Sequence, residues 1–154
     1  MVCPAVSEGV WVLVAVLGSA SAFGVYRAVH DGRFRGTHPV RGTARAAAPE
    51  PGVLLGTDFE HRLGERATLL QFSSAFCAPC RATRRVLADV AAVAPGVEHI
   101  EVDAEHHLDL VRRLGILRTP TTLILDGDGR ELSRASGAPR KEQVLASLSA
   151  ALEV

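Results

Sequence analysis

The hydrophobic pattern divides the chain into an apolar N-terminal segment and a longer region of short alternating runs. Between Glu8 and Arg27 no residue is charged, and the positions are predominantly apolar on every side of a helix. About twenty such residues form a helix roughly 30 Å long, which matches the hydrocarbon core of a bilayer. We therefore predict one membrane-spanning helix over residues 9–29, preceded by a short N-terminal tail of residues 1–8.

Two other structures fit the apolar segment: a cleaved signal peptide and a buried core helix. Ala20–Ala22 resembles a cleavage site. A signal peptide, however, carries positive charge before its apolar run, and the residues before Val10 include no lysine or arginine. The membrane span is therefore the preferred interpretation.

The charges beside the segment indicate its orientation. The nearest positively charged side chains all lie on its C-terminal side, at Arg27, Arg33, Arg35 and Arg41. Positive residues near a span tend to remain on the cytoplasmic side of the membrane. We therefore expect a single-pass protein of the cell membrane whose C-terminal domain faces the cytoplasm.

Residues 30–52 contain few large apolar side chains and are rich in Gly, Ala, Arg and Pro. Such a segment cannot bury enough apolar surface to fold by itself, so we predict a flexible linker. The globular domain is then expected over residues 53–154.

Within that domain, short apolar runs alternate with amphipathic segments. A lead-in strand or hairpin is predicted around Val53–Leu55 and Phe59. Further strands are predicted over residues 67–73, 97–103, 121–125 and 130–136, with helices after Cys77, from Leu108 to Gly115 and over residues 140–152, and a tight turn at 126–129. This order predicts an α/β domain with helices on both faces of a sheet.

Charge and cysteine content limit the kinds of binding and catalysis that the chain can perform. The chain has 17 basic and 17 acidic residues, and it shows no signature of nucleic-acid binding, no nucleotide-binding glycine loop and no Ser/His/Asp arrangement. It has three cysteines, of which Cys3 is far from the other two, so a disulfide-stapled scaffold is excluded. The pair Cys77 and Cys80 therefore indicates either redox chemistry or metal binding.

The cysteine pair lies where a predicted strand passes into a predicted helix. A thiol at a helix start meets unpaired backbone N–H groups and the positive end of the macrodipole, which favour the thiolate. This favours Cys77 as the nucleophile. Cys80 lies one turn further on, close enough to resolve a mixed disulfide on Cys77. The pair is expected to cycle between dithiol and disulfide.

The alternative for the pair is half of a zinc site. Zinc takes four ligands, usually with a second pair at comparable spacing. The remaining candidates are His99, the adjacent His106 and His107, and distant Cys3, and they provide no such pair. We therefore expect no metal and no other cofactor.

Two motifs resemble those of the thioredoxin-like thiol-disulfide oxidoreductases, including membrane-anchored bacterial members. The first has Phe76 before the first cysteine, Pro79 before the second and basic helix residues after it. The second, from Gly115 to Leu123, contains Thr119-Pro120 and resembles the loop that carries the family's cis-proline. The resemblance covers roughly residues 53–152 and implies a thioredoxin fold, with a central mixed sheet and helices on both faces.

The resemblance also implies a substrate-binding set. A cis bond before Pro120 would expose the backbone of Thr119 to an extended substrate strand, and Pro120 would keep metals off the dithiol. Phe76 would provide apolar cover over the nucleophile. Pro79 fits the first helical turn and accompanies a more reducing couple in the family.

Two positions depart from the family pattern. Gln71 stands where thioredoxins carry a buried aspartate that accepts the proton of the resolving thiol. An amide cannot titrate, so we expect release of the mixed disulfide by Cys80 to be slower than in a typical thioredoxin. Phe76 stands where the family usually has tryptophan, and it lacks the indole N–H.

The sequence thus predicts a membrane-tethered, monomeric oxidoreductase that reduces disulfides of other proteins through Cys77 and Cys80 and is recharged by an upstream reductant. The first alternative is an extracytoplasmic reductase for cytochrome c maturation or disulfide repair, because tethered bacterial relatives commonly face outward. The second is a noncatalytic thioredoxin-like adaptor or metal-binding module.

Overall fold

The computed structural model describes residues 5–30, 32–36 and 52–152. The chain divides into two compact units, Met1–Asp31 and Gly32–Val154.

The first unit is a single helix, α1 (Ala5–His30). Its segment Gly9–Arg27 has a mean hydropathy of 1.8, and none of it is buried within the chain. By length and composition this is the one helix among the described residues that could cross a membrane. The predicted apolar helix is therefore present.

The second unit is built on a five-stranded mixed sheet with the order β1-β5-β4-β2-β3. The central strand β2 (Ala67–Ser73) runs parallel to β3 (Val97–Asp103) and antiparallel to β4 (Thr121–Asp126). Strand β5 (Glu131–Ser136) is antiparallel to β4 and carries the short edge strand β1 (Phe34–Gly36). The predicted central mixed sheet is confirmed.

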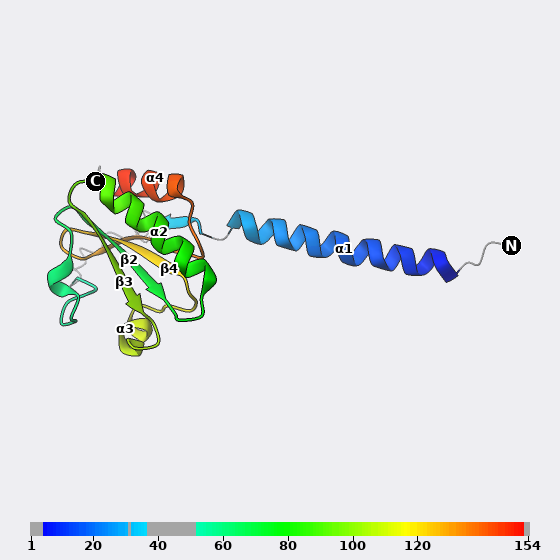
Figure 1. The fold of residues 1–154 in the computed structure, drawn as a ribbon, viewed down its shortest axis with the longest axis horizontal. Coiled ribbons are helices and arrows are strands. Elements are labelled where there is room, and N and C mark those ends of the chain that lie inside the picture. The colour runs from blue at the N-terminus through cyan, green and yellow to red at the C-terminus, as the bar shows by residue number, and fades with distance from the viewer. Residues whose placement is uncertain (1–4, 31, 37–51, 153–154) are drawn as a thin grey trace, which may run out of the picture. The chain divides into compact units, whose positions relative to one another are not determined.

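Helices cover both faces of this sheet, as Figure 1 shows, with α2 (Ala78–Val93) and α4 (Lys141–Leu152) on one side and α3 (Leu108–Arg113) on the other. Two apolar clusters fill the resulting layers. The cluster under α2 and α4 contains Ala67, Leu69, Leu87, Val90, Val97, Ile124, Val144 and Leu148. The cluster on the α3 side contains Leu54, Leu70, Phe72, Ile100, Val102, Leu110, Ile116, Leu123 and Leu125.

Strand β2 is buried along its whole length. Because side chains alternate between the faces of a strand, Leu69 enters the cluster under α2 while Leu70 and Phe72 enter the opposite one. The same alternation places Gln71 and Ser73 on the α2 side. A polar side chain is thus buried directly beneath the N-terminal turn of α2.

The lead-in strand or hairpin predicted around Val53–Leu55 and Phe59 is wrong. The backbone closes local turns instead, since Leu55 N–H donates to Gly52 O and Thr57 N–H donates to Leu54 O, and a short 3-10 helix η1 (Glu60–Arg62) follows. Leu54 is nevertheless fully buried in the α3-side cluster. The apolar run around Leu54 therefore indicates a buried segment, although this segment does not form a strand.

The linker predicted over residues 30–52 is wrong for its first part. Gly32 N–H donates to Ser136 O at 2.8 Å, and β1 then pairs with β5, with Phe34 opposite Ala135. The pairing uses backbone groups, and Gly32 adopts φ +77° with Ala138 O so close that a Cβ would clash. Only three residues lie between Gly32 and Gly36, and so short a segment shows no hydrophobic periodicity from which an edge strand could be predicted. The remaining predicted linker, residues 37–51, lies outside the described residues.

Candidate active site

Cys77 and Cys80 form a disulfide at the start of α2, with an S–S distance of 2.01 Å and Cα atoms 5.2 Å apart. Cys77 is the N-cap residue of the helix, and its Sγ accepts a hydrogen bond from Cys80 N–H at 3.2 Å. Pro79 lies in the first turn, where its missing N–H leaves no donor unpaired. The predicted strand-to-helix junction is confirmed, and it points the Cys80 N–H and the positive end of the helix dipole at the Cys77 sulfur.

The two sulfurs differ in exposure. Cys80 is fully buried, whereas Cys77 is partly exposed. A partner disulfide can therefore reach Cys77 first, which agrees with the assignment of Cys77 as the attacking thiol and Cys80 as the resolving one.

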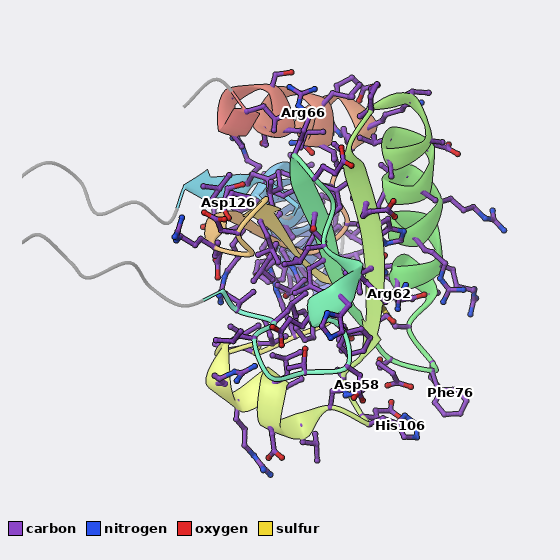
Figure 2. The ribbon with its side chains drawn as sticks, turned by 90° about the vertical axis from the view of Figure 1, so that its left-hand side faces the viewer. Asp58, Arg62, Arg66, Phe76, His106 and Asp126 are labelled. Carbon is purple, nitrogen blue, oxygen red and sulfur yellow. A yellow bond between two sulfur atoms is a disulfide. The ribbon has the colours of Figure 1, made fainter. Side chains whose placement is uncertain are left out.

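Phe76 is 98% exposed. Figure 2 shows its ring projecting from the loop before α2 away from the body of the domain, at the same end as His106. An aromatic ring with so little cover is available to a visiting protein. It does not pack over the disulfide as an intramolecular lid.

The second motif lies beside the first. The Thr119-Pro120 peptide bond is cis, as predicted. The hydroxyl groups of Ser74 and Thr119 lie 3.2 Å apart, and Gly137 N–H donates to Pro120 O at 2.8 Å. Among the described residues, neither the N–H nor the C=O of Thr119 has a hydrogen-bond partner, so both can pair with an extended strand.

Beneath the disulfide, a chain of hydrogen bonds runs from the resolving cysteine to strand β3. The Gln71 amide donates from Nε2 to Cys80 O at 3.0 Å, and Gln71 Oε1 lies 3.2 Å from His99 Nε2. The sequence singled out Gln71 but missed His99 in this role. The alternating pattern of residues 97–103 was the available signal, because it places His99 on the same face as Val97, under α2.

A second polar contact anchors α2 next to this chain. Glu101 accepts hydrogen bonds from Ser73 Oγ at 2.7 Å and from Arg84 Nη2 at 2.8 Å, and Arg84 Nε lies 2.7 Å from its other oxygen. The bidentate pair joins the second turn of α2 to β3.

Burial lowers the pKa of His99 below its ordinary value of 6.5. Glu101 raises this pKa, while the nearby charges of Arg84 and Arg62 lower it. His99 is therefore neutral at neutral pH, directly beside the amide that holds Cys80.

The lowered pKa of His99 predicts a pH-dependent stability. The unfolded state binds a proton at His99 at higher pH than the folded state does, so the free energy of unfolding should fall as the pH drops below 6.5. In urea denaturation of the full chain at pH 7.5 and 5.5, the variant His99→Gln should lose less stability between the two values than the wild type. Equal losses would contradict the assignment.

Gln71 gives a kinetic prediction. The variant Gln71→Asp places a titratable carboxyl beneath Cys80, where it can accept the proton of the resolving thiol. We expect faster release of a mixed disulfide from Cys77 than in the wild type, measured by stopped flow on the full chain. Equal rates would show that the amide does not limit resolution.

Among the described residues, no group of three or more His, Cys, Asp or Glu side chains is arranged to hold a metal ion. His106 instead pairs with Asp103, with Nδ1 and Oδ2 2.9 Å apart, and the His107 ring meets Phe59 edge-on with centroids 5.0 Å apart. Cys3 lies outside the described residues.

Comparison with known proteins agrees with this geometry. Residues 51–150 match the thioredoxin family model. The thioredoxin of Alicyclobacillus acidocaldarius is 31% identical over 103 residues, which cover 66% of this chain and 97% of that protein. Thioredoxin H-type 1 of Nicotiana tabacum is 28% identical over 78 residues, which cover 51% of this chain and 61% of that protein.

Solved structures share the fold. A thioredoxin of Fasciola hepatica superposes with a TM-score of 0.52 at 24% identity, covering 60% of this chain and 86% of that one. A thioredoxin of Nicotiana alata gives a TM-score of 0.52 at 23% identity, covering 57% of this chain and 75% of that one. With the cysteine pair at the start of α2 and the cis-proline beside it, these matches show that the chain belongs to the thioredoxin family of thiol-disulfide oxidoreductases.

Proposed function

We propose that the protein is a membrane-tethered protein-disulfide reductase that works through Cys77 and Cys80. The observation that carries the proposal is the accessible disulfide at a helix start, with one sulfur partly exposed and the other buried. Such a pair can transfer two electrons to another disulfide and then be reduced again.

In the reduced protein, the Cys77 thiolate attacks a disulfide of the partner and one partner thiolate leaves. Cys80 then loses its proton and attacks Cys77 Sγ, so that the Cys77–Cys80 bond forms and the second partner thiolate departs. The partner gains two electrons and two protons, and the protein is left as the disulfide seen in the structure. An upstream reductant must restore the dithiol.

Partner binding is assigned to the surface around Cys77. The free backbone groups of Thr119 can pair with an extended segment of the partner, next to cis Pro120. Phe76 adds an exposed ring, and exposed Pro79 gives the adjacent surface an apolar character. These groups recognise backbone and apolar surface, so the partners are proteins with accessible disulfides.

An insulin-reduction assay tests this activity. The full chain in detergent, with dithiothreitol as the reductant, should accelerate insulin reduction, and Cys77→Ser should reduce the rate to that of dithiothreitol alone. Cys3→Ser is the matched control and should retain full activity. No acceleration by the wild type, together with preserved partner binding by Cys77→Ser, would instead support a noncatalytic adaptor.

The membrane tether is the second part of the proposal. The helix α1 supports it through its apolar segment Gly9–Arg27, and the arginines after that segment favour a cytoplasmic domain. A reporter fused after Val154 tests the orientation. Alkaline phosphatase should be inactive there, because it folds only outside the cytoplasm. High activity would reverse the orientation and favour the extracytoplasmic alternative.

A further inference from the structure

The hydrogen bonds that link His99, Gln71 and Cys80 run in a defined donor-to-acceptor direction. The Gln71 amide must turn its NH₂ group toward Cys80 O, because its oxygen there would face another acceptor. Gln71 Oε1 then faces His99 Nε2 at 3.2 Å, so this nitrogen must carry a hydrogen. The hydrogen-bond network thus assigns the Nε2–H tautomer to neutral His99 and leaves Nδ1 as its basic atom.

A buried carboxylate at this position would accept hydrogen bonds, whereas the Gln71 amide donates one toward Cys80. Each link donates toward the resolving cysteine, from the imidazole to the amide and from the amide to the Cys80 carbonyl. When Nδ1 gains a proton, the hydrogen bond from His99 to Gln71 becomes charge-assisted, and a positive charge then lies one amide group away from the backbone of the residue that must carry a thiolate. The imidazole can therefore hold a counter-charge for Cys80.

We propose that His99 is a positioning residue for the resolving step: it takes up on Nδ1 the proton lost by Cys80 and, held near Cys80 by its hydrogen bond to Gln71, favours the Cys80 thiolate by its positive charge. The inference rests on the proposed function, because only a reductant that resolves a mixed disulfide uses this step. His99 is partly exposed whereas Cys80 is buried, and the hydrogen bonds through Gln71 reach only the Cys80 carbonyl, so water has to carry the proton from the Cys80 thiol to Nδ1.

The step balances. The Cys80 thiol and neutral His99 become a thiolate and an imidazolium. The thiolate attacks Cys77 Sγ in the mixed disulfide, the Cys77–Cys80 bond forms, and the bond from Cys77 to the partner sulfur breaks. The departing partner thiolate takes the proton from the imidazolium, which returns His99 to the neutral form.

The charged groups around His99 suit a reversible proton acceptor. Glu101 lies on the same strand and favours the imidazolium, whereas Arg84 on α2 and Arg62 on η1 oppose it. Burial also lowers the pKa of His99, so the imidazole is neutral at neutral pH and readily releases a proton that it has taken up. Glu101 itself is held by Arg84, with 2.7 Å between Nε and Oε2.

Stopped-flow reaction of the reduced full chain with the aromatic disulfide 5,5′-dithiobis(2-nitrobenzoate) tests the proposal between pH 5 and 9. Attack by Cys77 releases a first coloured thiolate, and resolution by Cys80 releases the second. In the wild type, the second rate should rise through the lowered pKa of His99, reach a plateau across neutral pH, and rise again as Cys80 itself ionises.

The variant His99→Gln keeps a side-chain N–H for Gln71 but cannot titrate. Its second phase should be about tenfold slower at pH 7 and should rise with pH without a plateau, while the first phase is unchanged. The matched control His106→Gln alters an exposed histidine that pairs with Asp103 and should keep the wild-type profile.

The role of His99 and the reductase activity are overturned by different results. A second phase of His99→Gln with the wild-type rate and plateau would overturn the role of His99 and leave the reductase intact. Absence of a second thiolate release in the wild type would overturn the proposed function itself. A change in His106→Gln equal to that in His99→Gln would also overturn the proposal, since it would show a general effect of losing a histidine.

Discussion

Replacing Cys80 by serine should leave the protein covalently attached to its partners through Cys77. The partly exposed Cys77 can still attack a disulfide, but serine has no thiol with which to release the product. We expect adducts that dissociate with reductant, visible on non-reducing gels of membranes that contain the full chain in a Cys3→Ser background. Turnover should stop, a loss of several orders of magnitude relative to the wild type.

The matched variant Cys77→Ser distinguishes the role of the Cys77 sulfur from that of the Cys80 sulfur. It retains the buried Cys80, which a partner disulfide cannot reach, so it should form no such adducts. Equal trapping by Cys77→Ser and Cys80→Ser would contradict the assignment of roles, because it would mean that exposure does not decide which sulfur attacks. Trapped partners, identified by mass spectrometry, would also define the substrate class.

Replacing Phe72 by alanine should destabilise the domain by about 3–5 kcal/mol, the usual cost of removing a buried aromatic ring from a core. Phe72 is fully buried in the central strand and packs in the α3-side cluster with Leu70 and Val102. The free energy of unfolding can be measured by urea denaturation of the full chain in detergent, followed by circular dichroism.

Phe76 provides the matched control, since it is the same residue type four positions later and is 98% exposed. Its replacement by alanine should change stability by less than about 0.5 kcal/mol, as for other surface substitutions. It should instead weaken the reduction of protein disulfides more than that of small disulfides. A large loss of stability in Phe76→Ala, or a small one in Phe72→Ala, would contradict the burial of Phe72 in the core and the exposure of Phe76.

Much of the fold was predictable because the elements near the site carry strong local patterns. Residues 67–73 and 97–103 form the strands expected from their apolar runs, and Gly115 ends the helical segment with φ +61°. The cis bond before Pro120 followed from the resemblance rather than from local chemistry. Local periodicity is most informative where a segment is both buried and regular.

The remainder depends on contacts between residues far apart in sequence. Strand β1 exists because its backbone pairs with β5, about one hundred residues later, and no local pattern encodes that pairing. The link between His99 and Gln71 likewise requires the parallel register in which His99 lies opposite Leu69. The sequence therefore located the two cysteines and Gln71, but not the histidine that lies behind Gln71.

The most direct test of the central claim is a redox titration of the full chain in glutathione buffers, with alkylation of free thiols and mass spectrometry. We expect Cys77 and Cys80 to be oxidised together as one two-electron couple, with about 30 mV per tenfold change in the ratio of disulfide to dithiol. Cys3 should not take part. Thiols at Cys77 and Cys80 that never form a bond with each other in any buffer would contradict the central claim.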